Sequence, residues 1–75
     1  MKKDGIIYLQ IEPKLINDLN HIFEGYEHVA MVSTVDNVNG IVKLWGTPDT
    51  QADMETIIVN LPFPAKKINR LSRII

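Results

Sequence analysis

The chain has 75 residues, of which 45% are hydrophobic and 23% are charged, a composition typical of one small globular domain. This length leaves room for one hydrophobic core, so we expect residues 1–75 to form a single domain. The absence of cysteine excludes disulfide bonds, thiolate metal sites and cysteine nucleophiles. No apolar stretch approaches the roughly twenty residues that cross a bilayer, and the charged N-terminus does not look like an export signal. We therefore expect a cytoplasmic protein that does not use a membrane.

The first two elements are predicted to be a strand and a helix. Residues 6–11 are rich in β-branched and aromatic side chains and precede Glu12 and Pro13, which favours a strand that ends before the proline. From Pro13 onward the apolar residues follow the i, i+3, i+4, i+7 spacing of one helical face. They are Leu15, Ile16, Leu19, Ile22, Phe23 and Tyr26. Gly25 stands where a helix commonly ends.

A β-hairpin is predicted next, from residues 28–35 and 41–45. The segment between them, Asp36-Asn37-Val38-Asn39-Gly40, is dense in residues that favour turns. Pairing Val35 with Ile41 across this turn separates the side chains into two faces. One face carries Val29, Met31, Ser33, Val35, Ile41, Lys43 and Trp45. The other carries Ala30, Val32, Thr34, Val42, Leu44 and Gly46, and this second face is expected to lie under the helices.

The remaining elements are a second helix and a last strand. Thr47-Pro48-Asp49 provides helix N-cap residues and a proline for the first turn, and Pro62-Phe63-Pro64 ends the helix. Residues 65–71 are long enough for one more strand. The order strand, helix, strand, strand, helix, strand is that of the ferredoxin-like plait. The sequence therefore predicts an α+β fold, in which both helices cover one face of a four-stranded antiparallel sheet.

The other sheet face is expected to carry an unusually large apolar surface. If Ile7, Leu9 and Ile11 pack under the helices, Ile6 and Tyr8 point to the open side. We interpret five residues of this side as an interface or ligand face. They are Tyr8, Met31, Ile41, Lys43 and Trp45. Because soluble monomers rarely expose so much apolar area, we expect a homodimer or a protein partner, with room for a small-molecule ligand in the seam.

A competing explanation is that the end of the chain folds back over the same face. The residues that would cover it are Leu71, Ile74 and Ile75. In that case the chain would bury its own apolar surface and need no partner. Both explanations cannot be fully true.

Three turn and cap segments resemble a family of short bacterial proteins classified only as a domain of unknown function. These segments are Ile22–Glu27, the hairpin ends Val35-Asp36 and Gly40-Ile41-Val42, and Thr47-Pro48-Asp49. The order of elements is also similar to that of ACT domains, which often bind amino acids at paired interfaces. This resemblance implies the plait fold and a tendency to pair. ACT domains usually have a glycine after the first strand, where this chain has Glu12-Pro13-Lys14, so the resemblance implies no ligand residue.

The sequence gives no sign of catalysis, and we expect neither an enzyme nor a bound cofactor. Ser33 and Ser72 do not stand in a recognisable nucleophile turn, and the carboxylates suit caps, turns and exposed faces. His21, Glu24 and His28 form the only cluster of metal-ligating types. Because no fourth ligand is evident, we interpret them as an exposed helix face and a strand-end histidine, and we expect no metal site.

The alternative function is binding of single-stranded RNA by the same open face. RNA-recognition plaits place an aromatic residue on the first strand to stack a base, and Tyr8 fits that position, with Trp45 as a second ring. Lys43 and four basic residues after residue 65 could contact phosphates. However, nine acidic residues and an isoelectric point near 6.0 argue against a strong electrostatic footprint. We therefore favour a non-catalytic interaction or regulatory module over a nucleic-acid binder.

Overall fold

The computed structural model describes residues 5–68 and contains the six predicted elements in the predicted order. Each helix begins with a short 3₁₀ turn. The elements are β1 (Ile6–Gln10), a 3₁₀ turn (Pro13–Leu15), α1 (Ile16–Glu24), β2 (Met31–Asp36), β3 (Ile41–Trp45), a 3₁₀ turn (Pro48–Thr50), α2 (Gln51–Val59) and β4 (Lys66–Ile68). The remaining part of the predicted last strand, residues 69–71, lies outside the described residues.

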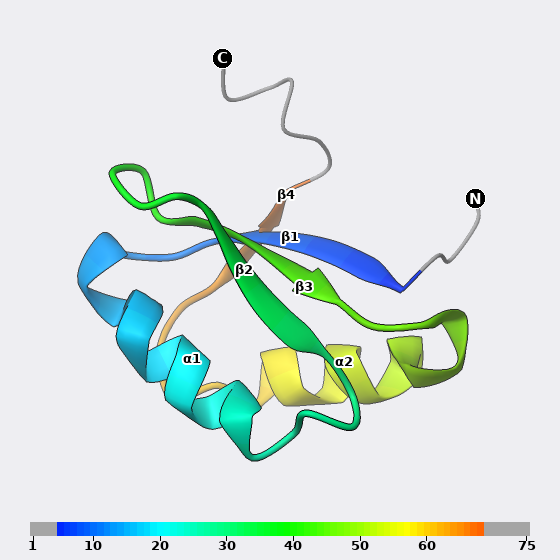
Figure 1. The fold of residues 1–75 in the computed structure, drawn as a ribbon. Coiled ribbons are helices and arrows are strands. Elements are labelled where there is room, and N and C mark those ends of the chain that lie inside the picture. Colours follow the sequence, from blue (N-terminus) through cyan, green and yellow to red (C-terminus); the bar gives the residue numbers. More distant parts are fainter. Residues whose placement is uncertain (1–4, 69–75) are drawn as a thin grey trace.

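The four strands form one antiparallel sheet in the order β2-β3-β1-β4. Both helices cover the same side of this sheet, and the strands cross above them (Figure 1). Strands β1 and β3 occupy the centre, as two right-handed β-α-β crossovers require. The predicted α+β class is confirmed, and the arrangement is consistent with a ferredoxin-like plait.

The core lies between the helices and the sheet. Alternation along β1 and β3 sends every second side chain toward the helices, where each is removed from water. The largest side chains buried in this layer are Phe23, Leu9, Leu19, Leu44, Met54 and Val42. Burial of one such side chain contributes about 1.5–3 kcal/mol, so this layer is the main stabilising contact of the fold.

Strand β2 begins three residues later than expected, at Met31 instead of His28. The reason is that the chain continues to turn after α1: the carbonyl of Tyr26 accepts hydrogen bonds from the N–H groups of Val29 (2.8 Å) and Ala30 (3.1 Å). Val29 is consequently buried in the core, and its predicted place on the open face is wrong.

The hairpin register is as predicted over most of β2 and changes next to the turn. Residues 31–34 pair with residues 45–42, which is the expected register. A β-bulge then places Asp36, and not Val35, opposite Ile41. A bulge inserts one extra residue into one strand, and here it lets Asp36 reach the turn backbone. Its Oδ1 accepts hydrogen bonds from the N–H groups of Val38 (3.0 Å) and Asn39 (3.1 Å).

No helix within residues 5–68 is long and apolar enough to cross a membrane.

Gly40 is the turn residue whose replacement is expected to cost the most stability. Its φ is +73°, and a Cβ atom there would overlap the carbonyl group of Ile11. We expect Gly40→Ala to lower the free energy of unfolding by about 2 kcal/mol or more, measured by urea denaturation. Gly25→Ala is the matched control, because Gly25 has helical angles and a Cβ there would make only an ordinary contact, 3.5 Å from the carbonyl oxygen of Ile22. This control should leave stability unchanged or raise it by up to about 1 kcal/mol. Equal losses of unfolding free energy in both variants would contradict the role given to the positive φ and close contact of Gly40.

Asp36 should make the hairpin sensitive to acid. Hydrogen bonds from the side chain of Asn39 (2.8 Å), then from the backbone of Asn39 and Val38, hold the pKa of Asp36 below its usual value. A carboxyl group with a lowered folded-state pKa stabilises the fold above its unfolded pKa, about 3.9, and loses this effect as the pH falls further. We expect the urea midpoint to fall less between pH 7 and pH 3 in Asp36→Asn than in the wild type, and Asn39→Ala to lie between them. An unchanged pH dependence in Asp36→Asn would contradict this account.

Candidate functional site

The open sheet face is the side of the sheet opposite the helices, and the strand registers arrange its side chains in rows. Directly paired residues lie on the same side of a sheet, so each row runs across the strands. The first row is Met31, Trp45 and Ile6; the second is Ser33, Lys43, Tyr8 and Ile68; the third is Asp36, Ile41, Gln10 and Lys66. We call the first of these the apolar row.

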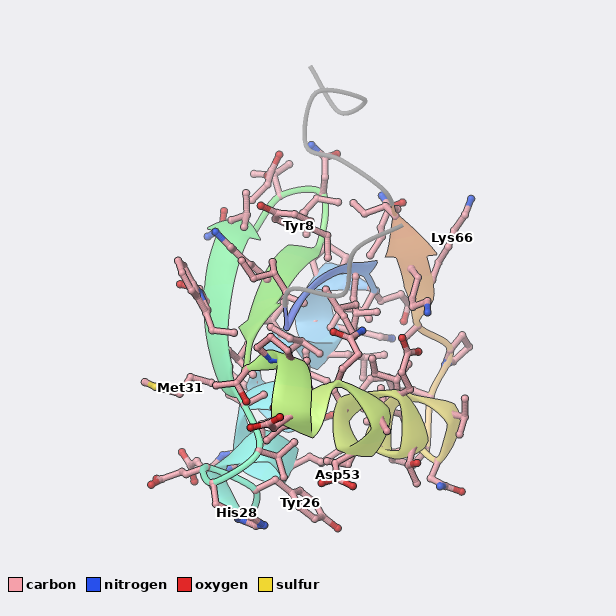
Figure 2. The ribbon with its side chains drawn as sticks, turned by 90° about the vertical axis from the view of Figure 1, so that its right-hand side faces the viewer. Tyr8, Tyr26, His28, Met31, Asp53 and Lys66 are labelled. Carbon is pink, nitrogen blue, oxygen red and sulfur yellow. The ribbon has the colours of Figure 1, made fainter. Side chains whose placement is uncertain are left out.

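The apolar row exposes large hydrophobic surface at one end of the sheet. The side chain of Met31 is 67% exposed and that of Trp45 is 46% exposed, and the two residues are direct cross-strand neighbours. Figure 2 shows Met31 projecting outward from β2, while Tyr8 lies at the end of the molecule opposite the helices. Exposed apolar side chains that are adjacent indicate an interaction site more strongly than scattered ones do, because they form a continuous patch.

Lys43 lies between two aromatic rings in the middle of the open face. Its Nζ lies 3.7 Å from the ring centroid of Trp45 and 5.6 Å from that of Tyr8. Within residues 5–68 no carboxylate forms an ion pair with this ammonium group. Two cation–π contacts therefore hold the lysine against the face.

The structure places the five predicted face residues in two groups. Lys43 contacts the rings of both Tyr8 and Trp45, and Met31 adjoins Trp45. Ile41 is on the same side of β3 by alternation, but it is completely buried. An interface residue needs accessible surface, so Ile41 does not belong to the candidate site.

The three residues with metal-ligating side chains do not form a common site. His21 Nδ1 lies 3.6 Å from Glu24 Oε1 on the exposed surface of α1. His28 lies instead beside Tyr26, with their ring centroids 6.4 Å apart. In the part of the chain that the structure describes, no three histidine or acidic side chains lie close enough to hold a metal ion.

Sequence reasoning missed a groove of about 680 Å³ on the helix side, which we call the helix groove. The turn after α1 contributes Tyr26 and His28, and α2 with the residues after it contributes Asp53, Asn60 and Leu61. These two segments are far apart in the sequence, and only the packing of the helices brings them together. The one available signal was Tyr26, an aromatic residue that continues the apolar helix pattern beyond Gly25.

Comparison with protein families finds one match, a family model described as Domain of unknown function (DUF4911), over residues 9–64. The chain belongs to this family. The resemblance inferred from the turn and cap segments is thereby confirmed. Comparison with curated proteins and with solved structures finds no match. Met31, Lys43 and Trp45 lie within the part that matches DUF4911, as does the whole helix groove, whereas Ile6 and Tyr8 precede it.

Proposed function

We propose that this DUF4911 protein is a non-catalytic interaction module that pairs with a second copy of itself through the open sheet face. The observation that supports this most directly is the apolar row, in which Met31 and Trp45 lie exposed side by side. A small metabolite held in the seam between the copies is part of the same proposal. The reason is that Lys43 and Tyr8 border the row and offer an ammonium group and a phenol.

Symmetry and charge favour pairing centred on the apolar row. A two-fold axis over this row packs Met31 and Trp45 of one copy against the same residues of the other, with each Lys43 ammonium group over the ring of its own Trp45 at the edge of the contact. An axis over the second row would bring the two Lys43 side chains together, and like charges in a closed contact are strongly unfavourable. The proposed pair therefore overlaps at one end of the sheet and leaves Gln10 and Lys66 in solvent.

Trp45 and Met31 supply the apolar centre of the proposed interface. Covering the exposed part of the Trp45 side chain removes on the order of 100 Å² from water, which contributes about 2.5 kcal/mol per copy before the costs of association. Met31 adds a flexible side chain that adapts to its neighbours. A domain of this size has a small core, so pairing also stabilises its fold by mass action.

Trp45→Glu and Met31→Glu test the proposed contact. We expect the wild type to sediment as a dimer at micromolar concentration and both variants to sediment as monomers, because a carboxylate cannot be buried in this seam without a partner. The matched control is Val59→Glu, the same type of change at a residue that is 76% exposed on α2, on the other side of the molecule. This variant should remain a dimer.

A wild type that sediments as a monomer of 8.5 kDa would contradict self-pairing. That result would support the alternative in which the end of the chain covers the face. The residues concerned, Leu71, Ile74 and Ile75, lie outside the described part of the chain. Truncation before Arg70 would then raise the exposure of Trp45, measured by acrylamide quenching of its fluorescence. The same truncation in a true dimer should leave the quenching unchanged.

The second candidate function is binding of single-stranded RNA, and the contact of Lys43 with both rings is the observation that favours it. Two aromatic rings that flank a cation are suited to stacking bases beside a phosphate. In the free protein, however, the ammonium group lies over the ring of Trp45 and covers a surface that a base would need. Acidic side chains also outnumber basic ones in the whole chain.

A salt titration separates the two functions. If the face binds RNA, the affinity for a single-stranded oligonucleotide should fall steeply with salt concentration. Lys43→Gln should then reduce the slope of log affinity against log salt concentration by about one, because one phosphate contact is lost. If the face pairs with a second copy, the dimer should persist over the same salt range and oligonucleotide binding should be weak throughout. Fluorescence anisotropy of a labelled oligonucleotide gives both the affinity and the slope.

A further inference from the structure

We propose that the helix groove is a binding site for a small organic cation with a methylene chain, the chemistry of an aliphatic polyamine. The groove lies on the helix side of the molecule, away from the open sheet face, so this site is independent of the proposed pairing. Figure 2 shows Tyr26, His28 and Asp53 gathered at this end of the molecule, with Tyr8 at the opposite end.

The size of the groove favours a small molecule over a protein. Its volume of about 680 Å³ is within the range of small-molecule sites, about 300–1,000 Å³. Ten of the described residues line it, whereas a stable protein interface involves about twenty to thirty residues on each side. The floor is formed by partly buried aliphatic residues, among them Ile22, Ile57 and Leu61. An aliphatic chain can cover this floor and remove apolar area from water.

The rim of the groove selects a positive charge. Asp53 contributes a carboxylate, and within residues 5–68 no side chain pairs with it by a hydrogen bond or an ion pair. Tyr26 is 42% exposed, so part of its ring is free to receive an ammonium group. Among residues 5–68, no lysine or arginine lines the groove. A cation bound there therefore meets a carboxylate and a π face, and no lysine or arginine of the described residues competes for them.

A second attractive position lies at the other end of α2. The side chain of Asn60 donates its Nδ2 hydrogen to the carbonyl of Thr56 (2.8 Å), which leaves its Oδ1 as an acceptor. The groove also receives the C-terminal ends of both helices, since Tyr26 follows α1 and Asn60 follows α2. Helix C-termini carry partial negative charge and attract cations. A ligand with ammonium groups at both ends of a methylene chain can therefore bind at Asp53 and near Asn60 at once.

The wider charge distribution supports the same preference. Acidic side chains dominate the helix side of the molecule. They are Asp18, Glu24, Glu27, Asp49, Asp53 and Glu55. Two of the described lysines form ion pairs with carboxylates: Lys14 lies 3.8 Å from Glu12, and Lys67 lies 2.8 Å from Glu55. Among the described residues, this distribution of charge favours a cation over an anion near the groove.

A diamine and a diol with the same eight-carbon chain test the role of charge, and spermidine serves as a natural polyamine. The protein is titrated with 1,8-diaminooctane, 1,8-octanediol and spermidine, and amide chemical shifts are followed by NMR. We expect both amines to shift the amide signals of Tyr26, His28, Asp53 and Asn60, and the diol to bind at least fivefold more weakly. The Trp45→Glu variant should bind the amines as the wild type does, whatever its oligomeric state. This result keeps the test separate from that of the proposed pairing.

The variants Asp53→Asn and Asp18→Asn form a matched pair. Each removes one exposed negative charge from a helix, but only Asp53 lines the groove. We expect Asp53→Asn to weaken diamine binding about three- to fivefold and Asp18→Asn to leave it nearly unchanged. Tyr26→Leu, with the melting temperature as a check on folding, should weaken binding by a similar factor. Equal binding of diol and diamine, equal effects of the two aspartate variants, or amide shifts elsewhere on the surface would each overturn the proposal.

Discussion

The packing of two helices against one face of an antiparallel sheet is the contact on which the rest of the structure depends. Leu9 and Leu44 from the central strands meet Leu19 and Met54 from the helices in a layer that excludes water. Because side chains alternate along a strand, burying these residues obliges their neighbours to face the other way. The exposure of Trp45 next to Leu44 thus follows from the core itself.

The strand ends that carry the apolar row are held by a small polar junction. The N–H of Gly46 donates to the carbonyl of Gly5 (2.6 Å), which ties the end of β3 to the start of β1. The N–H of Gly5 donates in turn to Oε1 of Gln51 (3.1 Å), a buried polar residue at the start of α2. The side-chain amide of Gln51 also donates to Glu55 (3.1 Å). A satisfied polar group in a buried position fixes local geometry, so the contacts of Gly5, Gly46 and Gln51 help to place the strand ends that carry the apolar row.

The two sides of the molecule differ in chemistry as well as in structure. The sheet side combines exposed apolar and aromatic side chains with Lys43 and Lys66, whereas the helix side carries most of the acidic residues. A surface of the first kind suits contact with another macromolecule, and a small apolar groove with a carboxylate on its rim suits a small organic cation. The two proposals therefore use separate surfaces, and each can fail without affecting the other.

The sequence alone determined the order of elements, the plait fold and most of the sheet faces, because helix and strand periods and turn residues act locally. The turn at Asp36–Gly40 and the spacing after Pro13 needed no knowledge of distant residues. Tertiary structure decided the burial of Val29 and Ile41, the bulge beside Asp36 and the existence of the helix groove. Burial depends on which segments pack together, and no local sequence pattern indicates that the turn after α1 packs beside α2. The residues of the groove therefore became visible only when the two helices were placed side by side.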